Sequence, residues 1–131
     1  MITVEWANET KTAINCRLPK GWTWEDFYAA QKEVDALIDT VPGIVDTIFL
    51  PEESGHPPPS TLTHLRNVTL RRHKRYGLSI LVDPNAYMQV LLGALGRIMP
   101  NDNIIRFVET EEEAHALVER MQQKRRLQQQ V

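Results

Sequence analysis

Three short apolar runs constrain the fold of this chain more than any other feature of its sequence. They lie at residues 44–50, 78–82 and 104–108. The first two are rich in β-branched and large aliphatic residues, which is typical of strands buried on both faces. Segments with helical periodicity separate the three runs. Neighbouring strands that are joined through helices lie parallel in one sheet, with right-handed crossovers.

Two further strands are predicted before the first helix. Apolar residues alternate with polar ones over residues 2–6 and again over residues 14–18. Residues 7–10 are suited to a turn between them, so we expect this pair to form an antiparallel hairpin. The lone cysteine, Cys16, falls in the second strand, where we expect a small core residue without a disulfide partner.

Four segments carry helix signals. Thr23 and Asp26 form a capping box before a helix that ends at Pro42-Gly43. A second helix is expected from Ser60 or Thr61 to about Arg75, with Ser60 or Thr61 as its cap. A third follows Asp83-Pro84 and ends near Met99, and a fourth begins at Thr110 with an acidic first turn.

The predicted order is therefore strand, strand, helix, strand, helix, strand, helix, strand, helix. We expect an α/β fold with a mixed, mainly parallel sheet of about five strands and four helices. Residues 1–121 should form a single domain, and residues 122–131 a polar, basic tail that frays or extends the last helix.

Composition narrows the function classes. The chain has 131 residues and a formal net charge of −2, which gives no overall field that attracts nucleic acid. Its opening residues lack a signal-peptide pattern, and no apolar run is long enough to span a membrane. We therefore expect a cytoplasmic protein. The one basic cluster, at residues 71–75 with Arg66, is expected to be a solvated helix end.

The element order resembles that of the STAS domain, and in particular the SpoIIAA-like (STAS-like) group. Residues 77–82 resemble the fourth strand of that group, and residues 104–114 resemble its closing strand and acidic helix start. The resemblance implies a regulatory binding module. In antagonists of this family a phosphorylatable serine follows the third strand; here Ser54-Gly55 keeps part of that motif, Glu53 replaces its aspartate, and Ser60 and Thr61 lie nearer the helix start.

The loop at residues 52–60, rich in proline and acidic residues, is the predicted functional region. It follows a central strand, and ligands of open α/β sheets bind at the carboxyl ends of the strands. The N-terminus of the helix that follows the loop would stabilise a bound anion, or a phosphate on Ser60 or Thr61. The simpler interpretation is that Ser60 or Thr61 only caps this helix. Glu53 with His56 leaves an acid–base site open as an alternative.

No nucleophile motif, nucleotide-binding loop or zinc-like spacing of the histidines is present, so we expect neither catalysis nor a metal or other cofactor. The third helix, residues 84–99, has an unusually wide apolar arc that includes Tyr87 and Leu92. A neighbouring helix, a second subunit or an apolar ligand would each cover it. The predicted binding residues are Glu53, Ser54, His56, Ser60, Thr61, Tyr87 and Leu92.

Overall fold

The structure is a computed structural model that describes residues 1–52, 58–98 and 105–129. Within the third helix, the side chains of residues 86, 87, 92, 95, 96 and 98 also lie outside the description. The described residues form five strands and four helices in the predicted order. They are β1 (Thr3–Trp6), β2 (Ala13–Leu18), α1 (Trp24–Asp39), β3 (Val45–Pro51), α2 (Thr61–Leu70), β4 (Tyr76–Val82), α3 (Ala86–Ile98), β5 (Ile105–Val108) and α4 (Glu111–Gln129).

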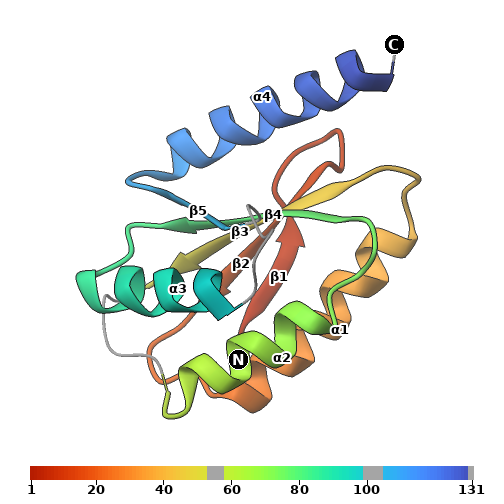
Figure 1. Cartoon of the computed structure of the whole chain (residues 1–131). Helices are drawn as coiled ribbons and strands as arrows, with labels where there is room; N and C mark the ends of the chain where they lie inside the picture. The colour runs from red at the N-terminus through yellow and green to blue at the C-terminus, as the bar shows by residue number, and fades with distance from the viewer. Residues whose placement is uncertain (53–57, 99–104, 130–131) are drawn as a thin grey trace.

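The strands form one sheet in the order β1-β2-β3-β4-β5 (Figure 1). β1 pairs antiparallel with β2, and every later pair is parallel. The predicted α/β class, with a leading hairpin and a mainly parallel sheet, is therefore confirmed. Each parallel strand adds beside the one before it, so the crossover helices α1, α2 and α3 all cover the same face.

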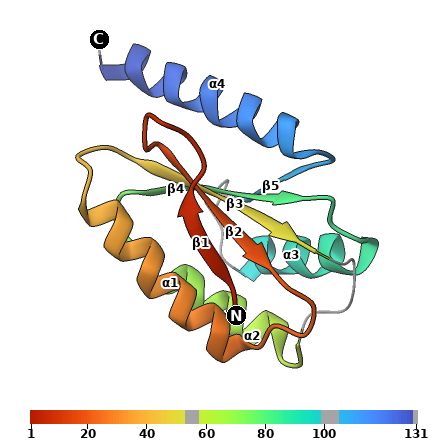
Figure 2. The ribbon, with the colours of Figure 1, turned by 180° about the vertical axis from the view of Figure 1, so that it is seen from behind.

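The helices divide unequally between the two faces of the sheet. Figures 1 and 2 show α1, α2 and α3 on one face and α4 alone on the other. On the three-helix face, Ile14 of β2 and Val45 of β3 belong to one core cluster with Phe27 and Ile38 of α1. On the opposite face, Ile48 and Ile80 pack against α4. The cavity described below lies in the first of these two layers.

Helix starts and ends follow the capping signals in part. Thr23 and Asp26 form the predicted capping box of α1. The second helix is shorter than predicted: it ends at Leu70, and the basic residues 71–75 form the connection to β4. The expected cap at Asp83 is also wrong, because Asn85 Oδ1 instead accepts a hydrogen bond from Met88 N–H at 2.8 Å.

The last helix continues to Gln129, so the tail extends α4, which is the second of the two forms predicted for it. Its final turns contact the body of the fold through Asp46 of β3, which is completely buried. Arg125 donates from Nη1 to Asp46 Oδ2 at 3.0 Å and from Nη2 to Oδ1 at 2.8 Å. This two-point ion pair fastens α4 to the strand beneath it.

The same carboxylate organises an irregularity between β3 and β4. The register shifts there, so that Val45 pairs with Tyr76 while Thr47 pairs with Ser79. The extra residue in β4 leaves the Leu78 N–H directed at Asp46 Oδ1, to which it donates at 2.7 Å. Gly77 lies against this group, and a Cβ there would overlap Asp46 Oδ1 and come within 2.7 Å of Arg125 Nη2.

Removing Arg125 should destabilise the fold strongly, because it leaves the Asp46 carboxylate buried without its counter-ion. We expect Arg125→Ala to lower the free energy of unfolding by about 3 kcal/mol in a urea titration followed by circular dichroism. Arg126→Ala is the matched control, since Arg126 is exposed on the next position of α4. That control should change the unfolding free energy by less than about 0.5 kcal/mol. Equal losses in the two variants would contradict the role given to Asp46.

Glycine at position 77 should be required for the close approach of β4 to the ion pair. Gly77→Ala is expected to cost about 2 kcal/mol or more in the same titration, because its Cβ displaces Asp46 and Arg125. Gly43→Ala provides the comparison, because no atom lies within 4 Å of the position a Cβ would take there. A Gly77→Ala protein as stable as Gly43→Ala would show that the space beside Asp46 adapts freely.

Candidate functional site

An apolar cavity lies between the sheet and the three helices on its first face, and its floor consists of two rows of side chains across the strands. In one row, Thr47 of β3 pairs with Ile14 and Ser79, and of these two neighbours Ser79 lines the cavity. In the next row, Phe49 lies between Cys16 and Leu81. Because successive strand residues point to opposite faces, both rows face α1, α2 and α3.

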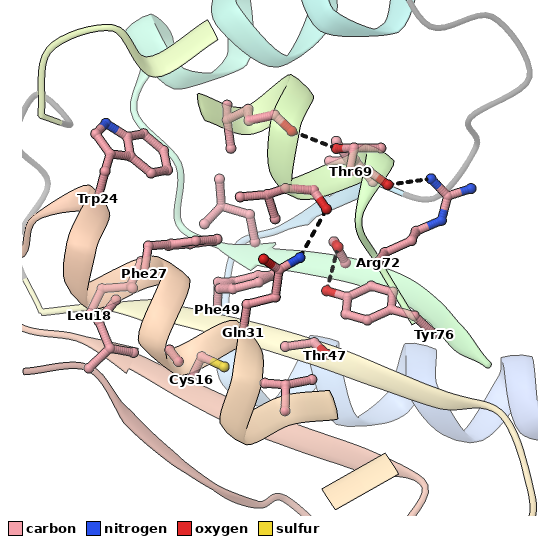
Figure 3. A pocket seen from close by; sticks show the side chains of 18 of the residues that line it. Cys16, Leu18, Trp24, Phe27, Gln31, Thr47, Phe49, Thr69, Arg72 and Tyr76 are labelled. Carbon is pink, nitrogen blue, oxygen red and sulfur yellow. Dashed lines mark hydrogen bonds between the residues drawn. The ribbon is translucent and has the colours of Figure 1, made fainter. Parts of the chain in front are cut away.

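The roof of the cavity comes from the helices. Phe27, Ala30 and Val34 line it from α1, Leu65 and Val68 from α2, and Met88 from α3. Gln31 Nε2 donates to the Val68 carbonyl at 3.0 Å, which joins α1 to α2 above the cavity (Figure 3). The cavity is partly open to the outside and has a volume of about 120 Å³. That is slightly smaller than a cavity of about 150 Å³ that is known to hold benzene in another protein.

The two ends of the cavity differ in chemistry, as Figure 3 shows. Aromatic rings dominate one end, where Trp24 and Phe27 have ring centroids 5.3 Å apart and Phe27 stacks on Phe49 at 5.7 Å. Polar groups gather at the other end, where Arg72, Tyr76 and Thr47 lie. The cavity therefore offers an apolar aromatic surface and a hydrogen-bonding surface to one occupant.

Three hydroxyl groups form the core of the polar end. The Tyr76 and Ser79 hydroxyls are hydrogen-bonded to each other at 2.7 Å. Burial raises the pKa of the Tyr76 phenol, and the neighbouring Ser79 and Thr47 hydroxyls offset only part of that rise. Thr47 is fully buried, and its Oγ1 makes no hydrogen bond of ordinary geometry to the part of the chain that the structure describes. Buried hydroxyls are rarely left in this state.

The end of the predicted functional loop closes on the aromatic end of the cavity. Trp24 Nε1 donates to the Pro59 carbonyl at 3.1 Å, and Pro58 O accepts a hydrogen bond from Thr61 Oγ1 at 2.7 Å. His64 stacks on Trp24 with a centroid distance of 4.9 Å and is hydrogen-bonded through Nδ1 to the Tyr28 hydroxyl at 2.8 Å. These contacts hold the loop end, α1 and α2 together beside the cavity.

The structure describes only some of the residues predicted to bind a ligand or partner in this loop. Glu53, Ser54 and His56 lie outside the described residues, so the predictions for them stay predictions. Ser60 immediately precedes α2, with φ of 63° and no side-chain hydrogen bond to the helix. Thr61 is buried and its hydroxyl donates to Pro58 O. The expectation that either side chain caps α2 is therefore wrong: the left-handed backbone at Ser60 and the Pro58 carbonyl direct both hydroxyls elsewhere.

The wide apolar arc of α3 is described only in part. The side chains of Tyr87 and Leu92 lie outside the description, so their predicted contacts with a ligand or a second subunit stay predictions. Met88 lines the cavity, whereas Val90 is 71% exposed. The arc thus contributes at least one residue to the cavity wall.

The basic cluster at residues 71–75 serves the fold. Arg75 donates from Nη1 to the carbonyls of Val41 and Gly43 and from Nη2 to Ile38 O, which satisfies carbonyl groups at the end of α1. Arg72 Nη1 donates to Thr69 O at 3.0 Å. Arg72 therefore lies at the end of α2 as expected for a basic residue near a helix dipole, whereas Arg75 acts at the end of α1.

His73 also has a structural role. His73 Nδ1 accepts from the Arg75 N–H at 3.0 Å, so its Nε2 carries a proton and donates to Asp39 Oδ1 at 2.7 Å. Both ring nitrogens are thus engaged at the junction of α1 with the connection to β4. Within residues 1–52, 58–98 and 105–129, no three histidine, cysteine, aspartate or glutamate side chains come together as a metal site would require.

Comparisons with known proteins add no assignment: no family model, no curated protein and no solved structure matches this chain. Among the described helices, none is both long enough and apolar enough to cross a membrane. The STAS resemblance stays a prediction, and the case for function depends on the geometry of the cavity.

Sequence reasoning missed most of this site. The apolar pattern of the sequence indicates that Trp24, Phe27 and Phe49 are core residues, and it predicts no functional role for Tyr76 or Ser79. One signal was available: Asp46 and Thr47 interrupt an otherwise apolar run that predicts a buried strand. A polar residue in such a run requires a partner, which is a reason to look for a site on that strand.

The buried thiol on the cavity floor should be unreactive in the folded protein. Burial, with a smaller contribution from the charge of Glu33, raises the pKa of Cys16 to about 12. At pH 8 the thiolate fraction is then roughly a thousandfold below that of an ordinary cysteine. We expect iodoacetamide to label Cys16 slowly in buffer and fast in denaturing guanidinium, as followed by mass spectrometry. Fast labelling in both conditions would contradict this burial.

Proposed function

We propose that this chain is a non-enzymatic, STAS-like binding module that holds a small apolar molecule in the cavity between its sheet and helices α1, α2 and α3. The observation that carries the proposal is the cavity itself. About 120 Å³ of space is retained among side chains that otherwise pack closely. Empty apolar space costs stability, because its walls lose contacts that a ligand would restore.

The make-up of the walls favours binding over catalysis. The lining is largely aliphatic and aromatic, with a few polar groups at one end, as in sites that orient a small ligand. Its cysteine has a pKa raised to about 12, so it is not an activated nucleophile. The described histidines 64 and 73 form hydrogen bonds to Tyr28 and Asp39 and do not line the cavity.

Regulation by a protein partner fits the same site. The loop at residues 52–60 ends at Pro58 and Pro59, whose carbonyls contact Trp24 on the cavity wall. A ligand that moves Trp24 would therefore bear on the end of this loop. The roles predicted for Glu53, Ser54 and His56 belong to this part of the proposal, as does self-association through α3.

Filling the cavity should abolish ligand binding without unfolding the protein. Toluene is the probe, and we expect millimolar toluene to raise the melting temperature of the original protein by a few degrees, since a ligand of the native state stabilises it by mass action. Ala30→Leu places a larger side chain in the roof and should remove most of this rise.

Ala36→Leu is the matched control, because Ala36 lies on the exposed side of α1. It should leave the toluene response unchanged. Circular dichroism of both variants verifies that they are folded. No response of the original protein to toluene, or an equal response in all three proteins, would contradict the proposal.

A further inference from the structure

We infer that the exposed basic end shared by helices α2 and α3 docks on an anionic phospholipid surface. This basic end consists of Arg66, Leu70, Arg71 and Lys74 from α2 and its connection to β4, with Arg97 from α3. The inference goes beyond the proposed function and is independent of the cavity, because it concerns the outer surface of the helix layer. Three observations carry it: the distribution of charge along the chain, the topology that gathers the cations, and an exposed leucine among them.

Charge is distributed very unevenly along the chain. Residues 54–98 contain six of its 15 lysines and arginines but one of its 17 aspartates and glutamates. This segment, which includes α2, β4 and α3, therefore has a formal charge of +5, whereas the remaining residues together have −7. The net charge of −2 conceals a strongly basic region, which can attract an anionic surface locally.

The topology places the cations of this segment at one edge of the sheet. Both α2 and α3 connect neighbouring parallel strands, so each helix runs back against the strand direction and ends near the amino ends of the strands. The two helices contact each other, and Figures 1 and 2 show them beside each other on the same face of the sheet. Asp83, the single acid of the segment, follows the carboxyl end of β4 at the opposite edge.

The four cations of the basic end are all exposed, and none of their side chains forms an ion pair or a hydrogen bond with the residues that the structure describes. Arg72 and Arg75 differ, because their guanidinium groups donate to backbone carbonyls. On the α1 flank, Asp39 is hydrogen-bonded to His73, and Asp35 lies close to the same histidine. The positive charge of the basic end is therefore available to an anionic partner.

An exposed leucine distinguishes a lipid surface from a nucleic acid. Leu70 is 62% exposed at the last position of α2, between Arg66 one turn earlier and Arg71 directly after it. An aliphatic side chain flanked by arginines suits the boundary between phospholipid headgroups and acyl chains, where the leucine is buried and the cations reach the phosphates. The phosphate backbone of a nucleic acid would attract the same cations but gives Leu70 no apolar contact. Val90 of α3, at 71% exposure, adds a second aliphatic side chain to the outer surface of this helix layer.

Co-sedimentation of the full chain with phosphatidylcholine vesicles, with or without about one third phosphatidylserine, tests the inference. We expect binding to the mixed vesicles at low salt, little binding to pure phosphatidylcholine, and loss of binding as salt screens the charges. The double variant Arg66→Glu/Arg71→Glu should lower the partition coefficient at least about tenfold. Lys124→Glu/Arg126→Glu is the charge-matched control on α4, across the sheet, and should lower it less than about threefold. Circular dichroism verifies that both variants are folded.

A second pair of variants tests the apolar contribution. Leu70→Ser should weaken binding to the mixed vesicles about fivefold, because the leucine no longer enters the lipid. Leu127→Ser is the control, since Leu127 is 59% exposed on α4, and it should leave vesicle binding unchanged. A short DNA duplex is the competing partner, and its binding should not depend on Leu70.

The possible results are decisive in either direction. The inference is overturned if the original protein does not bind the mixed vesicles, if the two charge-reversal variants lose equal affinity, or if Leu70→Ser has no effect. Binding to the DNA duplex in preference to the mixed vesicles would also overturn it, in favour of a nucleic acid. Ala30→Leu should bind vesicles as the original protein does, so a failure of the cavity proposal and a failure of this inference are distinguishable.

Discussion

The buried Asp46 carboxylate is the interaction on which the arrangement of this fold depends. It lies inside the central strand β3 with no exposure to solvent, and it accepts from Leu78 N–H and from both terminal nitrogens of Arg125. A charge at this depth is tolerated only when such partners are complete. The requirement fixes the register shift between β3 and β4, the glycine at position 77 and the docking of α4.

Asp46 and Thr47 are adjacent in β3 and therefore point to opposite faces of the sheet. Both are fully buried, yet their surroundings differ. Asp46 meets α4 and is paired with Arg125, whereas Thr47 lies on the cavity side beside the Tyr76 phenol. One face of the strand is thus covered by α4, and the other lines the cavity.

Arginine and histidine side chains, whose types suggest nucleic-acid binding or catalysis from sequence alone, form hydrogen bonds that fix the helices. Arg75 binds carbonyls at the end of α1, and His73 bridges to Asp39. Gln31 and Tyr28 join α1 to α2. These links keep α1 and α2 at a fixed separation above the sheet, which preserves the cavity against collapse.

Local patterns determined most of the fold. The apolar runs, the Thr23–Asp26 capping box and the acidic start at Thr110 predict the element order, and a chain that alternates strands with helices has few arrangements other than a parallel sheet. The prediction erred where a signal is only local. Asp83-Pro84 resembles a cap, but Asn85 performs that role. The second helix ends at Leu70, and Arg75 beyond it donates to carbonyls at the end of α1.

The candidate site was decided by tertiary structure. Its walls come from α1, α2, α3 and the sheet, and residues as distant in sequence as Cys16, Thr47 and Tyr76 meet there only after the crossovers are formed. Sequence periodicity reports which residues are buried, but packing decides whether a buried residue touches another side chain or an empty space. The sequence by itself therefore determined that Thr47 lies within a buried strand, and only the packing of helices over that strand decided which side chains surround it.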